Sequence, residues 1–409
     1  MENHLLVHEK EAAEIIVQRP RVLLFDDMGI GKTVSVLYGL KKASDDVTEP
    51  VKCVVCAPNT LLGQWVEEIS LWLENFNAVV AVGDKETREI KYNYFSSVSK
   101  NAVLLTNYSL LVKDTYFNDL KAYALILDEG YLIRNRNTKA YQFLRSFIDR
   151  FSKVIILSGN ADSFTDQQFY DIVNLMFPGQ IQKADKLNMQ EMLGDRYISR
   201  GIDTISKDIK IDVEPEIISV PQALSETQQA LLSETSVEEN RAMKTDNYSS
   251  RAYTKKKQAI LNSPRILDAT YENSPKEEFM LKVIKTAVGK CVVYCPDRKF
   301  FKLLKSDLNT AGIKYSAVSG EMPINIRNRN LGLFKFDGSV KCLLLSGVGK
   351  FGLNLQMANT LICMGVPKGK FDLMQVIGRL NRINQHEKVV CYIPYHQDTV
   401  EEKLIKSLL

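Results

Sequence analysis

Short apolar runs alternate with longer segments of mixed character through the first half of the chain. Four runs have the composition of buried strands: VKCVVCAP, NAVLLTNY, YALILDE and KVIILSG. Such runs are typical of strands buried on both faces of a parallel sheet, and the longer segments between them have the apolar spacing of helices. The pattern predicts an α/β fold in which helices cover both faces of a parallel sheet.

The same rhythm returns after residue 285, in the runs KCVVYCP, VKCLLLSG, TLICMG and VVCYIPY. Between the two halves, residues 165–275 are more polar, and Ser225 to Gln228 form a capping-box sequence that starts a helix. A chain of 409 residues is also too long for one hydrophobic core. We therefore expect two lobes joined by a helical insertion and linker, with the boundaries 1–210, 211–275 and 276–409.

Composition and charge add little to this picture. The 53 Lys and Arg residues against 49 Asp and Glu residues give a net charge of +4, which is too mild to indicate a nucleic-acid partner by itself. No apolar run reaches membrane-spanning length, and the N-terminal segment is charged where a signal peptide would be apolar. We expect an intracellular, cytoplasmic protein.

Two cysteine pairs, Cys53/Cys56 and Cys291/Cys295, have spacings that loosely match half of a zinc site. Both pairs lie in Val-rich, strand-like runs, and in a strand residues three apart, such as Cys53 and Cys56, point to opposite faces. We therefore interpret these thiols as small buried hydrophobic side chains. The odd total of seven cysteines fits a reducing compartment.

The sequence DDMGIGKT stands between a strand-like run and a segment with helical spacing. In this context, backbone N–H groups and the positive end of a helix bind phosphates. Gly29 and Gly31 permit the tight backbone, although Asp26 stands where the first glycine is usual. Lys32 would reach the β- and γ-phosphates, and the Thr33 hydroxyl would bind Mg²⁺. The predicted nucleotide-binding residues of this loop are Asp27, Met28, Gly29, Ile30, Gly31, Lys32 and Thr33.

Asp128 and Glu129 close the apolar run that ends at Leu127. Asp128 would hold the Mg²⁺ shell, and Glu129 would act as the general base for an attacking water. A solvated strand end is the alternative interpretation. An acidic pair directly after a buried strand favours the catalytic one, so the sequence predicts a site that hydrolyses a nucleoside triphosphate.

The stretch QVIGRLNRINQ carries Arg379 and Arg382 three residues apart, which would place both on one side of a helix. There they would neutralise charge developing on the γ-phosphate, as arginine fingers do. A basic helix that faces solvent is the alternative. The basic segment 251–265 also leaves two interpretations open, a solvated helix face and direct nucleic-acid contact.

The order of these motifs resembles the Swi/Snf-type branch of the superfamily-two helicase-like ATPases, from about residue 5 to about residue 390. DDMGIGKT resembles motif I of that family. The other similar segments are CAPNTLLGQW (motif Ia), LTNYSLL (Ib), DEGYLIRN (II), LSGN (III), AILNSPRIL (ahead of lobe two), KFGLNLQMAN (V) and QVIGRLNRINQ (VI). The resemblance implies two RecA-like lobes and a minimal motor that hydrolyses ATP while it steps along one strand of duplex DNA. Such a motor would suit a virus or bacteriophage.

The resemblance also assigns roles to residues that spacing alone does not single out. Motifs Ia, Ib and V would touch the tracked DNA strand, and motif V would also link the DNA groove to the nucleotide cleft. The implied DNA contacts are Asn59, Thr60, Asn107, Tyr108, Asn354 and Gln356. The further implied nucleotide contacts are Glu9, Gly352 and Gln375.

The chain departs from the family pattern at several positions. Tyr131 replaces a His and Asn160-Ala161 replace Thr-Pro, so the relay between motifs II and III would be rebuilt or weakened. Lys368-Gly369-Lys370 stand where Trp-Asn-Pro is typical. Glu9 stands in place of an adenine-reading Gln. A carboxylate can accept from the adenine amino group but cannot donate to a ring nitrogen, which predicts looser base selectivity.

The sequence thus predicts an ATP-dependent translocase or remodeller that acts on double-stranded or branched DNA. Three alternatives remain: a strand-separating or branch-migrating helicase, a motor that displaces proteins such as polymerase from nucleic acid, and a non-catalytic nucleic-acid clamp. The clamp is disfavoured because the predicted catalytic residues are all present, namely Lys32, Asp128, Glu129, Arg379 and Arg382.

Overall fold

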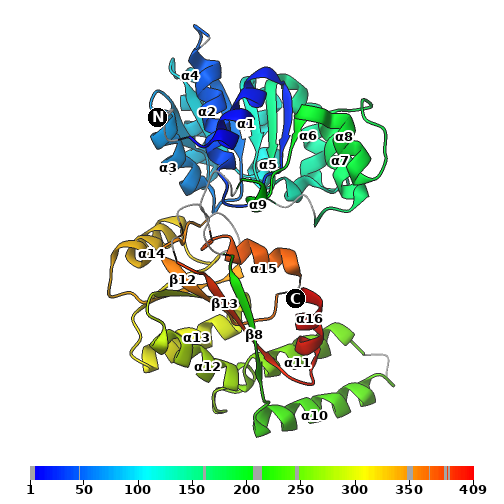
Figure 1. Cartoon of the computed structure of the whole chain (residues 1–409), viewed down its shortest axis with the longest axis vertical. Coiled ribbons are helices and arrows are strands. Elements are labelled where there is room, and N and C mark those ends of the chain that lie inside the picture. The colour runs from blue at the N-terminus through cyan, green and yellow to red at the C-terminus, as the bar shows by residue number, and fades with distance from the viewer. Residues whose placement is uncertain are drawn as a thin grey trace. The chain divides into compact units, whose positions relative to one another are not determined.

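The computed structural model of the chain describes residues 5–45, 47–159, 163–205, 214–244, 248–347, 353–367, 369–381, 385 and 387–409. The chain divides into two compact units, residues 1–210 and 211–409 (Figure 1). Each unit has its own sheet, and each is described by itself below.

The first unit contains a sheet of seven parallel strands over the described residues, in the order β3-β4-β2-β5-β6-β1-β7. Its strands are β1 (Arg21–Leu24), β2 (Lys52–Cys56), β3 (Asn77–Val80), β4 (Ala102–Thr106), β5 (Ala122–Leu127), β6 (Phe151–Leu157) and β7 (Tyr197–Ile198). Its α-helices are α1 (Val7–Gln18), α2 (Lys32–Asp45), α3 (Leu62–Trp72), α4 (Lys85–Ser97), α5 (Tyr108–Lys113), α6 (Lys139–Phe147), α7 (Asp166–Met176), α8 (Lys186–Leu193) and α9 (Ile202–Ile205).

Helices cover both faces of this sheet because its strands are apolar on both sides. Helices α1, α2 and α3 bury Ile16, Leu40 and Trp65 on one face. Helices α4 to α8 cover the other face, where an aromatic cluster surrounds Phe117 and Phe147. The loops at the carboxyl ends of the strands therefore lie on a rigid, doubly covered scaffold.

The second unit contains a parallel sheet of six strands within its described part, in the order β10-β11-β9-β12-β13-β8. Its strands are β8 (Glu216–Gln222), β9 (Lys290–Tyr294), β10 (Tyr315–Val318), β11 (Cys342–Leu345), β12 (Ala358–Cys363) and β13 (Val390–His396). Its α-helices are α10 (Glu226–Ala242), α11 (Ser250–Asn262), α12 (Pro275–Thr286), α13 (Arg298–Thr310), α14 (Ile324–Phe336), α15 (Lys370–Ile377) and α16 (Val400–Leu408).

Here too, helices pack on both faces. Helices α12 and α13 cover one face (Figure 1), and α14, α15 and α16 contribute apolar side chains to the other. A fully buried ion pair between Lys276 and Glu401 joins α12 to α16. The long helices α10 and α11 pack against each other, and Gln258 of α11 donates to Glu401.

The predicted α/β class is confirmed, and each of the eight apolar runs forms a strand. They correspond to β2, β4, β5, β6, β9, β11, β12 and β13. The capping box at Ser225 is also confirmed at the start of α10. The segment 211–275 differs from its helical expectation, because it also supplies β8 to the edge of the second sheet.

The cysteine side chains are buried in these sheets, and burial raises the pKa of Cys53 to about 12. Over the residues that the structure describes, no helix is both long and apolar enough to cross a membrane.

Candidate active site

Three loops of the first unit come together because their strands are neighbours. The sheet order β5-β6-β1 places the acidic pair after β5, Gly159 after β6 and the phosphate loop after β1. In a parallel sheet these carboxyl ends share one edge, and two strand spacings are about 10 Å. The fold thus brings together segments that lie about a hundred residues apart in the chain.

The phosphate loop has the tight backbone that its glycines predict. Gly29 and Gly31 have φ angles of +84° and +91°, in the region that favours glycine, and α2 begins directly afterwards at Lys32. A Cβ atom at position 31 would lie 1.9 Å from Oε1 of Glu9, so a larger residue does not fit there. The loop therefore presents backbone and a helix N-terminus, which together suit an anion.

Lys32 is folded back onto its own loop. Its Nζ donates to the carbonyl oxygens of Asp26 and Asp27, each at 2.6 Å. Burial lowers the pKa of Lys32, and four nearby carboxylates partly offset that effect. These belong to Asp26, Glu129, Asp128 and Asp27. The lysine thus lies within electrostatic reach of the acidic pair, as a phosphate-binding lysine should.

The acidic pair is held in a defined geometry. Trp65 donates its indole N–H to Oδ2 of Asp128 at 2.9 Å, and the backbone N–H of Glu129 donates to Oδ1 at 2.8 Å. Glu129 has φ 57° and ψ 56°, a left-handed conformation that costs energy for a residue other than glycine. A Cβ atom on Gly130 would lie 2.5 Å from Ile156, so this turn packs tightly onto β6. These contacts disagree with a freely solvated strand end.

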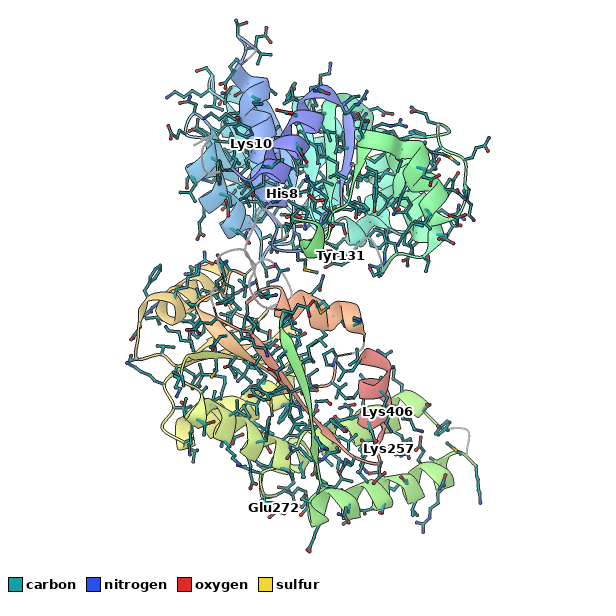
Figure 2. All side chains as sticks on the ribbon, viewed as in Figure 1. His8, Lys10, Tyr131, Lys257, Glu272 and Lys406 are labelled. Carbon is teal, nitrogen blue, oxygen red and sulfur yellow. The ribbon has the colours of Figure 1, made fainter. Side chains whose placement is uncertain are left out.

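Helix α1 docks onto the phosphate loop through its first turn, where Figure 2 labels His8. The His8 Nε2 donates to the carbonyl of Ile30 at 2.7 Å, and Oε2 of Glu9 accepts from the backbone N–H of Leu6 at 2.9 Å. Burial is the main cause that raises the pKa of Glu9 to about 7. Glu9 therefore lies beside the phosphate loop. Its predicted contact with the adenine base of the nucleotide stays a prediction.

Two of the residues expected to contact DNA in the first unit are joined to each other. Asn107 donates to the side chain of Asn59 at 2.7 Å, and its Oδ1 caps α5 by accepting from Leu110. Tyr108 instead turns inward, because its hydroxyl donates to the carbonyl of Asp128 at 2.8 Å. Thr60 has a buried hydroxyl without a hydrogen-bond partner among the described residues. The DNA contacts remain predictions.

One expectation about the second unit is wrong. Helix α15 ends at Ile377, and Arg379 follows in a turn, so Arg379 does not lie on a helix as its spacing had predicted. Gly378 caps the helix, and the Arg379 carbonyl accepts from the backbone N–H of Leu355 at 2.9 Å. Gly352 and Arg382 lie outside the described residues, as do Asn160, Ala161 and Lys368.

The motif V and motif VI loops are tied together nonetheless. The amide of Gln385 donates to the carbonyls of Gln356, Ala358 and Leu380. Asn354 is exposed, whereas the side chains of Gln375 and Arg379 are buried. Their predicted roles toward the nucleotide are therefore left as predictions.

A cavity of about 500 Å³ opens at the carboxyl edge of the second sheet. It lies between the start of α13 and the loops after β10 and β11. Its charged and hydroxyl-bearing lining residues are Arg298, Lys302, Lys305, Ser319, Glu321 and Ser346. Arg298 pairs with Glu321 at 3.0 Å, and Lys302 and Lys305 add positive charge that suits a phosphate group.

Sequence reasoning missed the residues that support the site. Trp65 was visible within the motif Ia segment, but nothing in the sequence pairs it with Asp128, 63 residues away. Arg200 likewise carries no motif, yet it forms an ion pair with Asp26. Tyr131, labelled in Figure 2, has the Arg134 guanidinium over its ring at 5.6 Å.

Comparison with known proteins agrees with the motif order. Residues 8–193 match the family model of the SNF2-related domain, and residues 275–384 match that of the helicase conserved C-terminal domain. Together these matches span most of the chain.

Similar curated proteins include the CHD3-type chromatin-remodeling factor CHR7 of Arabidopsis thaliana, 24% identical over 95% of this chain and 35% of that protein. The SWI/SNF-related matrix-associated actin-dependent regulator of chromatin subfamily A member 1 of Mus musculus is 21% identical over 94% of this chain and 40% of that protein. This chain spans about two-fifths or less of these relatives. The uncharacterized ATP-dependent helicase YqhH of Bacillus subtilis is 23% identical over 98% of this chain and 77% of its own length.

Among solved structures, the Sulfolobus solfataricus SWI2/SNF2 ATPase core in complex with dsDNA has a TM-score of 0.46 and 20% identity, over 98% of this chain and 90% of that one. Two family matches in the order that the motifs predicted, with a phosphate loop and acidic pair at one sheet edge, establish the relationship. The chain thus contains an SNF2-related domain in its first unit, followed by a helicase conserved C-terminal domain in its second.

Proposed function

We propose that this protein is an ATP-driven motor that moves along double-stranded DNA without bulk strand separation. The observation that carries the proposal is the meeting of the phosphate loop, Lys32 and the acidic pair at one sheet edge, in a chain that contains an SNF2-related domain. This arrangement supplies the parts that phosphoryl transfer to water needs.

In the proposed reaction, water attacks the γ-phosphoryl group of ATP, Glu129 accepts the proton of that water, and ADP leaves. Lys32 binds the phosphates after it releases the carbonyls of Asp26 and Asp27. We also propose that Arg379 and Arg382 neutralise the charge that develops on the γ-phosphate. In this scheme Glu129 accepts a proton, and Lys32 and the two arginines stabilise negative charge on the phosphates.

The donor set fits Mg²⁺. Asp128 Oδ2 accepts from Trp65 and Oδ1 accepts from the backbone of Glu129, and a carboxylate oxygen can take more than one partner. Mg²⁺ in nucleotide sites usually takes only one or two protein ligands, and Asp128 and Thr33 would provide them. Bound Mg²⁺ would offset the charge of the phosphates.

Two features support DNA as the track. The basic cavity of the second unit offers Lys302 and Lys305 to phosphates, beside the ion pair of Arg298 and Glu321. The linked amides of Asn59 and Asn107 offer hydrogen bonds beside the acidic pair. Phosphate contacts dominate sequence-independent binding, which is the kind of binding that a translocating motor needs.

The first test compares ATP turnover without nucleic acid and with single strands, duplex, fork, four-way junction and RNA, using Lys32→Ala as the inactive control. Duplex should stimulate more than single strands do. The second test pairs displacement of a triplex-forming strand with unwinding of a blunt duplex and a fork. Efficient fork unwinding without triplex displacement would replace the translocase with a strand-separating helicase. Junction-selective stimulation would favour branch migration, and release of a stalled polymerase without triplex displacement would favour a protein-displacing motor.

A further inference from the structure

Asp26 is a buried carboxylate at the start of the phosphate loop, and the proposed chemistry does not use it. Its side chain is only 1% exposed. Arg200 satisfies both of its oxygens: Nη2 donates to Oδ2 at 2.6 Å, and Nε and the backbone N–H donate to Oδ1 at 3.1 and 2.9 Å. Such a charged and hydrogen-bonded partner offsets the free energy that a buried carboxylate loses when it leaves water.

The same arginine also reaches α1. Its Nη1 donates to the carbonyl of His8 at 2.7 Å and contacts the exposed Glu11 carboxylate at 3.5 Å. The Arg200 carbonyl in turn accepts from the backbone N–H of Asp27 at 2.9 Å. Arg200 thus joins three segments: the start of the phosphate loop, the first turns of α1 and the end of β7.

Two of the joined segments, the phosphate loop and α1, form part of the predicted nucleotide site. The carbonyls of Asp26 and Asp27 hold Lys32 Nζ, and the carbonyl of Ile30 accepts from His8. Glu9, the next residue of α1, lies against Gly31. A shift of the Arg200 guanidinium would therefore move the loop and α1 relative to each other.

We propose that Arg200 is a positioning residue that fixes the phosphate loop against α1 for nucleotide binding. The proposal rests on the proposed role of this loop in binding ATP, and it adds a residue that no motif of the sequence singled out. An arginine is required because its planar fork contacts both Asp26 oxygens and the His8 carbonyl together, whereas a lysine has a single ammonium head.

The chain offers a matched control. Arg19 and Asp195 form another Arg–Asp pair at 2.6 Å, between the residue after α1 and the segment just before β7. That pair is about half exposed, with side-chain exposures of 47% and 45%, and among the described residues its side chains form no hydrogen bond to the phosphate loop. Arg19→Ala therefore removes the same type of interaction between the same regions without touching the loop.

The experiment compares Arg200→Ala, Arg200→Lys and Arg19→Ala in the full chain. Turnover, the KM for ATP, the Kd for a non-hydrolysed ATP analogue and the unfolding temperature are measured for each. Arg200→Ala should lower kcat/KM by up to about a hundredfold, the cost of a misplaced reactant in an active site, with part of the loss in the Kd. Arg200→Lys should recover part of that loss, and Arg19→Ala should match the wild type.

A purely structural ion pair gives a different result. It lowers the unfolding temperature of Arg200→Ala but leaves kcat, KM and Kd of the folded protein unchanged, and this outcome overturns the inference. If Arg200→Ala does not fold, Arg200→Lys decides, because it keeps a positive charge beside Asp26; wild-type kinetics in that variant also overturn the inference. Lys32→Ala separates the two proposals: if that variant keeps full nucleotide affinity, the assignment of the loop fails rather than that of Arg200.

Discussion

The carboxyl edges of the two parallel sheets present different side chains on similar scaffolds. In the first unit, a glycine-containing loop, Lys32 and a carboxylate pair converge, and Trp65 fixes one of the carboxylates. In the second unit, the corresponding edge has a cavity lined by Arg298, Lys302 and Lys305. The apolar runs determine the scaffold in both units, whereas the loops after the strands determine the chemistry. On the proposed function, the first unit carries the nucleotide chemistry and the second supplies supporting cations.

Buried carboxyl groups sharpen the comparison. Burial raises the pKa of both Glu9 and Glu277 to about 7. Glu9 belongs to α1 and packs against the phosphate loop at Gly31. Glu277 instead lies in a buried cluster of the second unit, beside Arg265. A raised pKa is therefore evidence of function only where the group also adjoins a site.

The largest effect should come from the cations assigned to the second unit. Replacing Arg379 or Arg382 with Ala should reduce turnover by about a thousandfold or more while ATP affinity is spared, because an arginine finger acts mainly on the transition state. Single-turnover hydrolysis and analogue binding measure the two quantities separately. Wild-type turnover in both variants would remove the second unit from the chemistry.

The general base of the first unit should have the next largest effect. Glu129→Gln should bind ATP but hydrolyse it about a hundredfold to ten-thousandfold more slowly, because an amide cannot accept the proton of the attacking water. Lys32→Ala is the contrasting variant, which should lose hydrolysis chiefly through nucleotide binding. Normal turnover by Glu129→Gln would sink the assignment of Glu129.

The predictable part of this protein is the part that local pattern determines. Eight strands, the tight turn at Gly29 and Gly31 and the capping box at Ser225 follow from residue types at fixed spacing. β3 and β10 were not predicted, because their runs are short and less apolar, and β8 lies in a segment that seemed helical.

Contacts between residues far apart in the chain could not be predicted from the sequence, for a different reason. Asp26 and Arg200 are 174 residues apart, and only the order of strands β1 and β7 makes them neighbours. Just after α15 ends, the Arg379 carbonyl accepts from Leu355, a contact that the helical spacing of the motif does not reveal. Sequence therefore predicts which groups carry the chemistry better than which groups hold them.

A substitution at Trp65 tests whether catalysis in the first unit depends on a residue that only positions a catalytic group. Trp65→Phe keeps an aromatic ring but removes the N–H donor to Asp128. A hydrogen bond to a charged group is worth about 1.5 kcal/mol or more, so the Mg²⁺ concentration for half-maximal turnover should rise about tenfold. Trp72→Phe, on the same helix, is the control because the Trp72 indole packs against the core and donates no hydrogen bond within the described part of the chain. Equal responses of the two variants would show a packing effect only.

Glu9 should make base selectivity depend on pH. Its pKa in the folded protein is raised from 4.5 to about 7, so the carboxyl is protonated below that pH and can donate as well as accept, as an amide does. The ratio of kcat/KM for ATP over GTP should therefore be higher at pH 6 than at pH 8, by about fivefold for one neutral hydrogen bond of about 1 kcal/mol. Glu9→Gln should keep a high ratio at both values.

The same protonation contributes to stability with a defined sign. Between pH 4.5 and about 7 the folded protein binds a proton at Glu9 that the unfolded chain releases, so this contribution is lost as the pH rises through 7. Glu277→Gln is the matched variant of the second unit, since it should change the pH dependence of stability without changing selectivity. A selectivity ratio that Glu9→Gln leaves unchanged at every pH would show that Glu9 does not face the base.

The smallest effects should come from the basic cavity, where each exposed cation contributes little by itself. Lys302→Ala or Lys305→Ala should raise the duplex concentration for half-maximal ATPase stimulation by about two- to threefold, in line with the modest energies of exposed charge pairs. Each phosphate contact that is lost should also lower the slope of log affinity against log salt by about one. Lys299→Ala is the control, because Lys299 is exposed on the same helix but does not line the cavity. If Lys299→Ala weakens stimulation as much as the cavity variants do, general surface charge explains the effect and the cavity is not a phosphate site.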